Sequence, residues 1–219
     1  MHFAVGLHNK VQTYEWEHRF KSWEYCFNEF AQPDPNVDLP LHLAFYLASF
    51  GMYRGSSGLL QKSYKIHEEA VRIICNEKWD SLRCSANNEF EENKIGDIIN
   101  LKECLSKYYK SIGYNRNGET QISPTDTLIS KILLGTLGCV PAYDNYFVKG
   151  LISRNIWAGR FNRDSLIKLN EFIISNNEDI ETAKRHALEF TGVFYPKMKI
   201  IDMYFWQSGF ELSTQTKSP

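Results

Sequence analysis

The sequence has almost no excess of charge and no long apolar run. Its 219 residues include 25 Lys plus Arg and 26 Asp plus Glu, which gives a formal net charge of −1. Such a balance creates no global field that attracts a polyanion or an acidic membrane, so contact with nucleic acid needs a local patch. No apolar stretch approaches the length of a membrane span, and no secretion signal is recognisable near Met1. These absences predict a cytoplasmic protein that makes no contact with membranes.

Familiar catalytic and metal-binding signatures are also missing. His67-Glu68-Glu69 has no second histidine at the spacing of a helix-borne zinc site, and Gly135-Thr136-Leu137-Gly138 is too short and too apolar for a phosphate-binding loop. Gly55-Ser56-Ser57-Gly58 has the wrong spacing for a nucleophile elbow. The five cysteines contain no CxxC pair, which indicates reduced, mostly buried thiols. We therefore expect neither a metal nor a cofactor.

The pattern that is present is helical. Apolar residues recur at three-and-four spacing in most windows, and no strict alternation is bounded by turn residues. Helices are predicted at about residues 11–30, 39–50, 57–74, 95–112, 124–134, 142–151, 163–173, 180–190 and 196–204. The sequence thus predicts an all-α fold with about nine or ten helices in a single domain over residues 1–212, followed by a disordered tail at 213–219.

Glycine, proline and small polar residues mark the ends of these helices. Gly51 ends the helix that begins at Leu39, and Ser56 or Ser57 caps the helix that follows. A later helix begins after Asn162, and the helix at residues 180–190 is closed by Gly192. Ser123 is a predicted cap, with Pro124 at the first helical position and Asp126 completing a capping box.

The first polar break inside an apolar region lies at residues 52–58 and contains Arg54. An arginine is expensive to bury unpaired, so we expect Arg54 to meet a carboxylate, helix-end carbonyls or an anionic ligand. One interpretation is an internal salt bridge that braces the turn. The other is an anion site, in which Tyr53, Arg54 and the amides of Ser56 and Ser57 at a helix start hold a phosphate or carboxylate.

The second break lies at residues 135–144, after an apolar helix that carries Lys131. Asp144 falls in the first turn of the next helix, close to the positive end of its dipole. In one interpretation Asp144 caps this helix while Lys131 extends its amine to solvent. In the other, Lys131, Tyr143 and Asp144 share one cleft.

The second break also carries a family resemblance. Lys131 on its helix, a short turn, and Val140-Pro141-Ala142-Tyr143-Asp144-Asn145-Tyr146-Phe147 resemble the helix-hairpin-helix DNA glycosylases over residues 125–151. In that family the lysine attacks the damaged nucleoside and the aspartate assists, so the resemblance implies these roles for Lys131 and Asp144. The whole chain is also similar to uncharacterised bacterial proteins with the Phe-Gly-Met-Tyr-Arg-Gly-Ser-Ser pattern of residues 50–57, which implies no activity.

Three functional hypotheses follow. The first is a nucleic-acid-associated domain whose cleft joins the two breaks, and it fails if the folded chain holds them far apart. A basic and aromatic cluster is present at Lys62, Tyr64, Lys65, His67 and Arg72. It could face a phosphate backbone, but such spacing more often indicates a solvated helix face. The second is a non-catalytic interaction protein or homodimer that uses the aromatic face from Tyr14 to Phe30. The third is a small-molecule enzyme or binder that holds an anion with Arg54.

Overall fold

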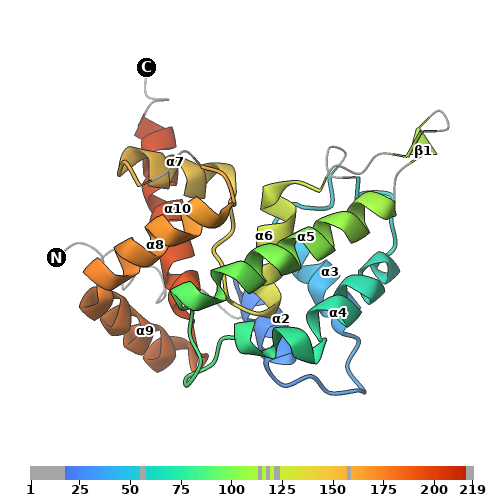
Figure 1. The fold of residues 1–219 in the computed structure, drawn as a ribbon, viewed down its shortest axis with the longest axis horizontal. Helices are drawn as coiled ribbons and strands as arrows, with labels where there is room; N and C mark the ends of the chain where they lie inside the picture. The colour runs from blue at the N-terminus through green and yellow to red at the C-terminus, as the bar shows by residue number, and fades with distance from the viewer. Residues whose placement is uncertain are drawn as a thin grey trace.

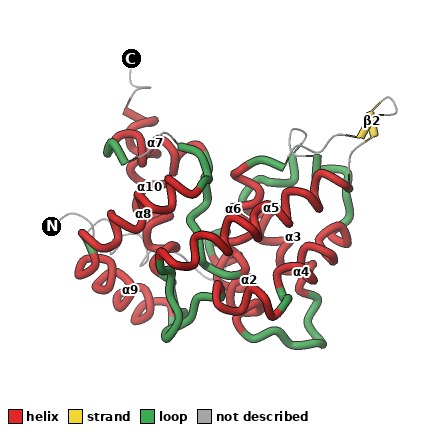
Figure 2. Tube along the Cα trace, in the orientation of Figure 1, coloured by secondary structure: helices red, strands yellow, loops and turns green. Residues whose placement is uncertain are grey.

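Helices make up nearly all of the secondary structure in the part of the chain that the computed structural model describes, residues 18–54, 58–112, 115–116, 119–120, 124–156 and 159–215 (Figure 2). The α-helices are α2 (Lys21–Ala31), α3 (Leu39–Ser49), α4 (Glu68–Ile74), α5 (Ile95–Ser111), α6 (Asp126–Thr136), α7 (Asn145–Ser153), α8 (Arg163–Ser175), α9 (Asn177–Thr191) and α10 (Lys197–Gln215). Three 3-10 helices are η1 (Tyr64–His67), η2 (Glu77–Leu82) and η3 (Glu92–Lys94). A short antiparallel hairpin pairs β1 (Asn115–Arg116) with β2 (Glu119–Thr120).

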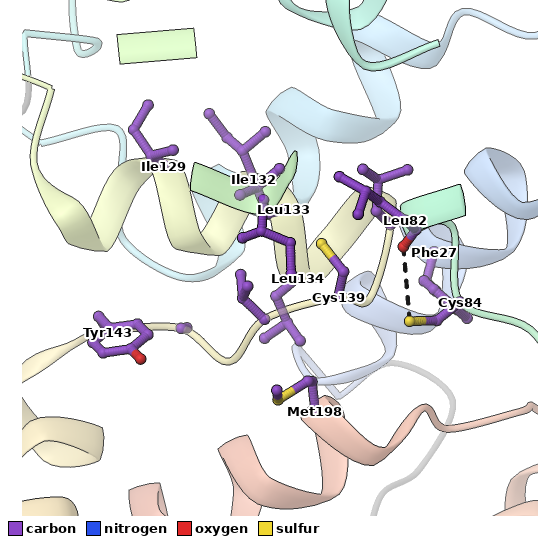
Figure 3. Packing of buried hydrophobic residues seen from close by; sticks show 14 of the residues in the cluster. Phe27, Leu82, Cys84, Ile129, Ile132, Leu133, Leu134, Cys139, Tyr143 and Met198 are labelled. Atoms are coloured by element: carbon purple, nitrogen blue, oxygen red, sulfur yellow. Dashed lines mark hydrogen bonds between the residues drawn. The ribbon is translucent and has the colours of Figure 1, made fainter. Parts of the chain in front are cut away.

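The helices form two neighbouring groups that share one core. Helices α2 to α6 lie on the right of Figure 1 and α7 to α10 on its left. Buried side chains join the groups, since Met198 of α10 belongs to the same cluster as Leu133 and Leu134 of α6 and Cys139 (Figure 3). This arrangement confirms the predicted all-α single domain. No helix in the described residues is long and apolar enough to cross a membrane.

Several predicted helix ends are confirmed by their backbone geometry. Gly51 has a φ of 70° directly after α3, and the Met52 N–H donates to the carbonyl of Leu47 at 2.9 Å, which is a common way to end a helix. Asn162 caps α8 through the amide of Ser165, and Gly192 ends α9 in the left-handed region.

Other predicted ends are wrong because different residues cap the helices. The helix predicted from Ser56 or Ser57 begins only at Tyr64, capped by Ser63, while Ser56 and Ser57 themselves lie outside the described residues. The next predicted start is also displaced, because Thr125 caps α6 and Asp126 is its first residue. The predicted cap Ser123 lies outside the described residues.

Helix α10 also extends further than the sequence predicted. It continues to Gln215, so residues 213–215 belong to a helix and not to the predicted tail. Residues 216–219 lie outside the described part of the chain.

The structure describes part of the aromatic face from Tyr14 to Phe30 and the basic cluster. Within the Tyr14 to Phe30 face, three large rings are buried in the core: Trp23, Phe27 and Phe30. Tyr14 and Trp16 lie outside the described residues. In the basic cluster, His67 is fully buried, Lys65 pairs with Glu68, and Arg72 pairs with Glu69. The basic cluster therefore presents much less positive charge than its sequence indicates. A homodimer through the face from Tyr14 to Phe30 stays a prediction.

The cysteines bear out the prediction of mostly buried free thiols. All five are free, and three of them are buried: Cys26, Cys84 and Cys139. Burial raises the pKa of each of these three thiols, which keeps them protonated and unreactive. These three cysteines belong to the core. The cytoplasmic location of the protein stays a prediction.

His67 links the loop after α3 to the long helix α5. Its Nε2 lies 2.8 Å from Tyr53 Oη and its Nδ1 lies 2.6 Å from Tyr109 Oη. A neutral imidazole has one donor and one acceptor nitrogen, so it satisfies both phenols. Burial lowers the pKa of His67 from 6.5 to about 4.

This histidine makes the folded state sensitive to acid. The unfolded chain takes up the proton near pH 6.5 and the folded chain only near pH 4, so stability is complete above pH 6.5 and falls between these values. We expect the free energy of unfolding of the native chain to fall by about 1 kcal/mol per pH unit relative to His67→Gln in that window. Urea denaturation at pH 6.5, 5.5 and 4.5 measures this difference, and equal slopes for the two proteins would contradict it.

Candidate functional site

The two polar breaks meet at one cavity. It has a volume of about 470 Å³ and lies where α2, α3 and α6 face α7 and α10. Arg54 from the first break and Asp144 from the second both line it, together with Lys131. The sequence-derived condition for a shared cleft is therefore met.

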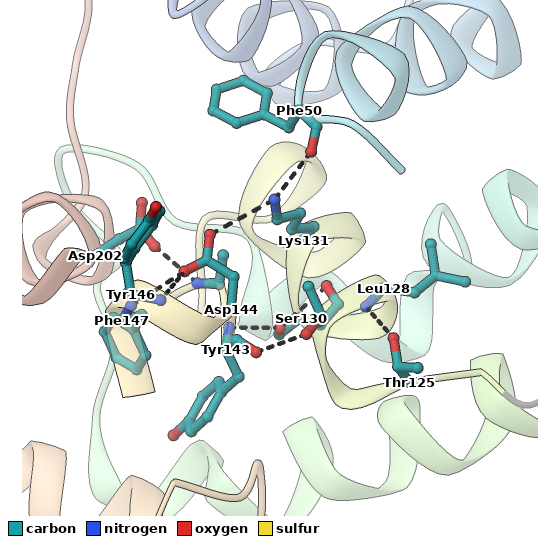
Figure 4. A network of polar contacts seen from close by, with 12 residues as sticks. Phe50, Thr125, Leu128, Ser130, Lys131, Tyr143, Asp144, Tyr146, Phe147 and Asp202 are labelled. Carbon is teal, nitrogen blue, oxygen red and sulfur yellow. Dashed lines mark hydrogen bonds and ion pairs between the residues drawn. The ribbon is translucent and has the colours of Figure 1, made fainter. Parts of the chain in front are cut away.

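Lys131 is buried on α6, with 7% of its side chain exposed. Its Nζ donates to the carbonyl oxygen of Phe50 at 3.3 Å and lies 3.7 Å from Asp144 Oδ2 (Figure 4). The interpretation that Lys131 extends its amine to solvent is therefore wrong. Burial lowers the pKa of Lys131, and the negative charges of Asp144 and Asp202 partly offset this effect. A lowered pKa increases the neutral, nucleophilic fraction of the amine.

Asp144 caps α7 and also faces the cavity. Its Oδ1 accepts hydrogen bonds from the amides of Tyr146 and Phe147, both at 3.1 Å, while Oδ2 faces Lys131. The backbone before it is held by α6, because the Tyr143 amide donates to Ser130 Oγ at 2.8 Å. The Asp144 carboxylate is thus both a helix cap and a fixed partner of Lys131. The two interpretations of Asp144 from the sequence, a cap and a member of a shared cleft, therefore hold together.

A second buried ion pair, which the sequence reasoning missed, lies beside the first. Lys199 Nζ is 3.2 Å from Asp202 Oδ2, and the two side chains are 10% and 11% exposed. Asp202 Oδ1 also accepts from the Ala142 amide at 3.0 Å, which ties α10 to the segment before Asp144. Burial raises the pKa of Asp202, Lys199 lowers it, and the neighbouring Asp144 raises it again.

Further polar side chains line the cavity. Glu24 of α2 is buried, pairs with Lys21 at 2.9 Å and accepts a hydrogen bond from Tyr195 Oη at 2.7 Å. Tyr46 of α3 is also buried, and burial raises the pKa of its phenol, as do nearby carboxylates, chiefly Asp202. Of the side chains lining the cavity, six are cationic and four are carboxylates, so the lining has a positive excess.

Arg54 lines the cavity and is exposed to solvent. The sequence analysis expected Arg54 to be buried and therefore to need a partner, but Arg54 is not buried. Its charge contributes to lowering the pKa of Lys131, which indicates that the two cations act on the same space.

Two predicted ligand-binding residues do not line the cavity. Tyr53 turns to His67, as described above, and Tyr143 is buried with its hydroxyl 2.6 Å from Ser165 Oγ. The Tyr143 ring stacks on Phe161 at a centroid distance of 5.1 Å. Both residues pack the fold around the site. The other two predicted ligands, Ser56 and Ser57, lie outside the described residues.

Within the described ranges, no group of three or more His, Cys, Asp or Glu side chains is arranged to hold a metal ion. Comparison of the chain with known protein families, curated proteins and solved structures found no match. The geometry of the cavity therefore carries the functional argument by itself.

Proposed function

We propose that this protein binds a small anionic molecule in the cavity, which the exposed Arg54 and other cationic side chains line. The observation that carries the proposal is the meeting of both sequence breaks at one concave site with a positive excess. Ligand sites commonly combine a mostly apolar cavity of this size with a few convergent polar groups. Asp144 would hold the Lys131 amine in place, since its other oxygen is fixed by the start of α7.

Thermal unfolding with inorganic pyrophosphate and with citrate tests this proposal. A ligand that binds only the folded state raises its stability by RT ln(1 + [L]/Kd), about 2.7 kcal/mol at a hundred times Kd. We expect the Tm to rise with at least one of the two anions beyond the effect of NaCl at equal ionic strength. In Arg54→Gln the anion concentration that gives the same rise should be about tenfold higher, because a charged hydrogen bond is lost.

The matched control is Arg185→Gln, which removes an exposed arginine from α9 that does not line the cavity. It should respond to the anions as the native chain does. No rise beyond that in NaCl, or an equal loss in both variants, would show that the cavity is not an anion site.

A second candidate function is a lysine-dependent reaction on a nucleoside in DNA, as the glycosylase resemblance implies. The contact between Lys131 Nζ and Asp144 Oδ2 favours it, because that chemistry needs these two groups together. The neutral Lys131 amine would attack a sugar carbon, and burial promotes the neutral form by lowering the pKa of the lysine.

Borohydride trapping tests this second candidate with an oligonucleotide that contains an abasic site. The Lys131 amine would add to the C1′ aldehyde and lose water to give an imine, and hydride from borohydride would reduce it to a stable secondary amine. We expect a covalent protein–DNA band for the native chain and for Lys149→Gln, which alters an exposed lysine of α7. The band should be missing for Lys131→Gln, and its persistence there would rule out Lys131 as the nucleophile.

A further inference from the structure

One side of the cavity is a continuous row of aromatic rings from four separate segments. Phe50 after α3 stacks on Phe20 before α2 at 5.9 Å between centroids. Phe20 meets the edge of Trp206 of α10 at 6.4 Å, and Trp206 meets Tyr146 of α7 at 5.2 Å. All four rings are partly exposed and line the cavity. We call this row the aromatic wall.

Two further arginines line the same cavity as the aromatic wall. The Arg19 guanidinium lies 5.3 Å from the centre of the Phe20 ring, and that of Arg154 lies 5.6 Å from the centre of Tyr204. Both arginines are exposed, and neither forms an ion pair with any described residue. By contrast, the two buried lysines that line the cavity already have carboxylate partners: Asp144 for Lys131 and Asp202 for Lys199.

This division of charge indicates how a ligand would be oriented. An added anion gains more from arginines without carboxylate partners than from lysines whose charge is already matched. Planar aromatic groups of any kind stack on exposed aromatic side chains, because each has a π-face. The ligand's anionic group therefore belongs beside the exposed arginines and its planar part against the aromatic wall.

We propose that the occupant of the cavity is a nucleotide, with its base stacked on the aromatic wall and its phosphate bound by Arg19 and Arg154. This inference rests on the anion-binding function proposed above and names the class of ligand. A nucleotide joins one planar ring system to one phosphate, which are the two features that the aromatic wall and the exposed arginines accept. It is either free in solution or part of a nucleic-acid strand.

Isothermal titration calorimetry with five probes tests the inference: AMP, CMP, adenosine, inorganic phosphate and a ten-nucleotide single-stranded DNA. We expect at least one nucleotide probe to bind about tenfold or more tightly than either adenosine or phosphate, because only nucleotides reach both features. If the natural ligand is a free mononucleotide, AMP or CMP should bind at least as tightly as the DNA. If the natural ligand is a nucleic-acid strand, the DNA should bind more tightly than either mononucleotide.

Three variants locate the binding. Trp206→Ala should weaken nucleotide binding about tenfold through lost stacking, whereas Trp206→Phe keeps a ring and most of the affinity. Arg154→Gln should weaken nucleotides and phosphate but leave adenosine unchanged, and Arg185→Gln should change nothing. Nucleotides that bind no tighter than phosphate, with the pyrophosphate or citrate effect intact, would overturn the nucleotide assignment and leave the anion site standing. Loss of both effects would overturn the anion site itself.

Discussion

Lys199→Met is expected to destabilise the fold by about 3–5 kcal/mol at pH 7, because it leaves the buried Asp202 carboxylate without its cationic partner. The remaining hydrogen bond from the Ala142 amide does not neutralise the charge, and Asp144 repels it. Chemical denaturation of the native chain and the variant measures the loss. A cost below about 1 kcal/mol would show that solvent in the cavity screens Asp202, as it screens surface pairs.

The pH dependence and a double variant check the cause. Burial already raises the pKa of Asp202, so removing Lys199 must raise it further. The folded variant then takes up a proton before the unfolded chain does, and the loss of stability should shrink as the pH falls from 7 to 5. Adding Asp202→Asn to Lys199→Met removes the unpaired charge and should recover most of the stability. A double variant as unstable as the single one would point to lost packing.

Gly209→Ala should produce the second large effect, through the crossing of α7 and α10. A Cβ atom at Gly209 would overlap the carbonyl oxygen of Tyr146, and one at Gly150 would overlap that of Phe205. Both obstacles are backbone atoms, so the helices must move apart. We expect a loss of about 1–3 kcal/mol or more, despite the better helix propensity of alanine. The change would also displace Tyr146 and Trp206 and weaken nucleotide binding.

Gly96→Ala is the matched control for this prediction. Gly96 also lies in a helix, α5, but a Cβ atom there would meet nothing within 4 Å. Alanine should therefore stabilise the chain by about 0.5–1 kcal/mol through the lower entropy of the unfolded state. Thermal denaturation of both variants gives the comparison, and losses of similar size would contradict the account of the helix crossing.

Local sequence signals predicted the helices better than their starts. Spacing of apolar residues finds a helix wherever one face is buried, and Gly51 and Gly192 ended helices as expected because few other residues adopt their positive φ. Ser123 and Thr125 are both plausible caps by sequence, and Thr125 caps α6 in the structure. The start of α6 also makes a distant contact. Asp126 Oδ2 accepts from the Phe161 amide at 3.0 Å, which no local pattern contains.

The site was predictable only in part for the same reason. The breaks in apolar helices pointed to Arg54, Lys131 and Asp144, and the fold brings all three to one cavity. Their meeting depends on tertiary packing, which sequence spacing does not encode. Lys199 and Asp202 resemble an ordinary surface pair three residues apart. Their one signal was the run of apolar residues around them, Met198, Ile200 and Ile201, which are all buried.

The most direct test of the account is an NMR titration of the 15N-labelled native chain with inorganic pyrophosphate. Binding in the cavity predicts saturable shifts of backbone amides in both breaks, at Met52, Arg54 and Asp144, and in α6 at Lys131. Amides near Arg185 should stay unchanged. Shifts that scatter over exposed lysines and leave both breaks unaffected would contradict the claim that the meeting point of the two breaks is the functional site.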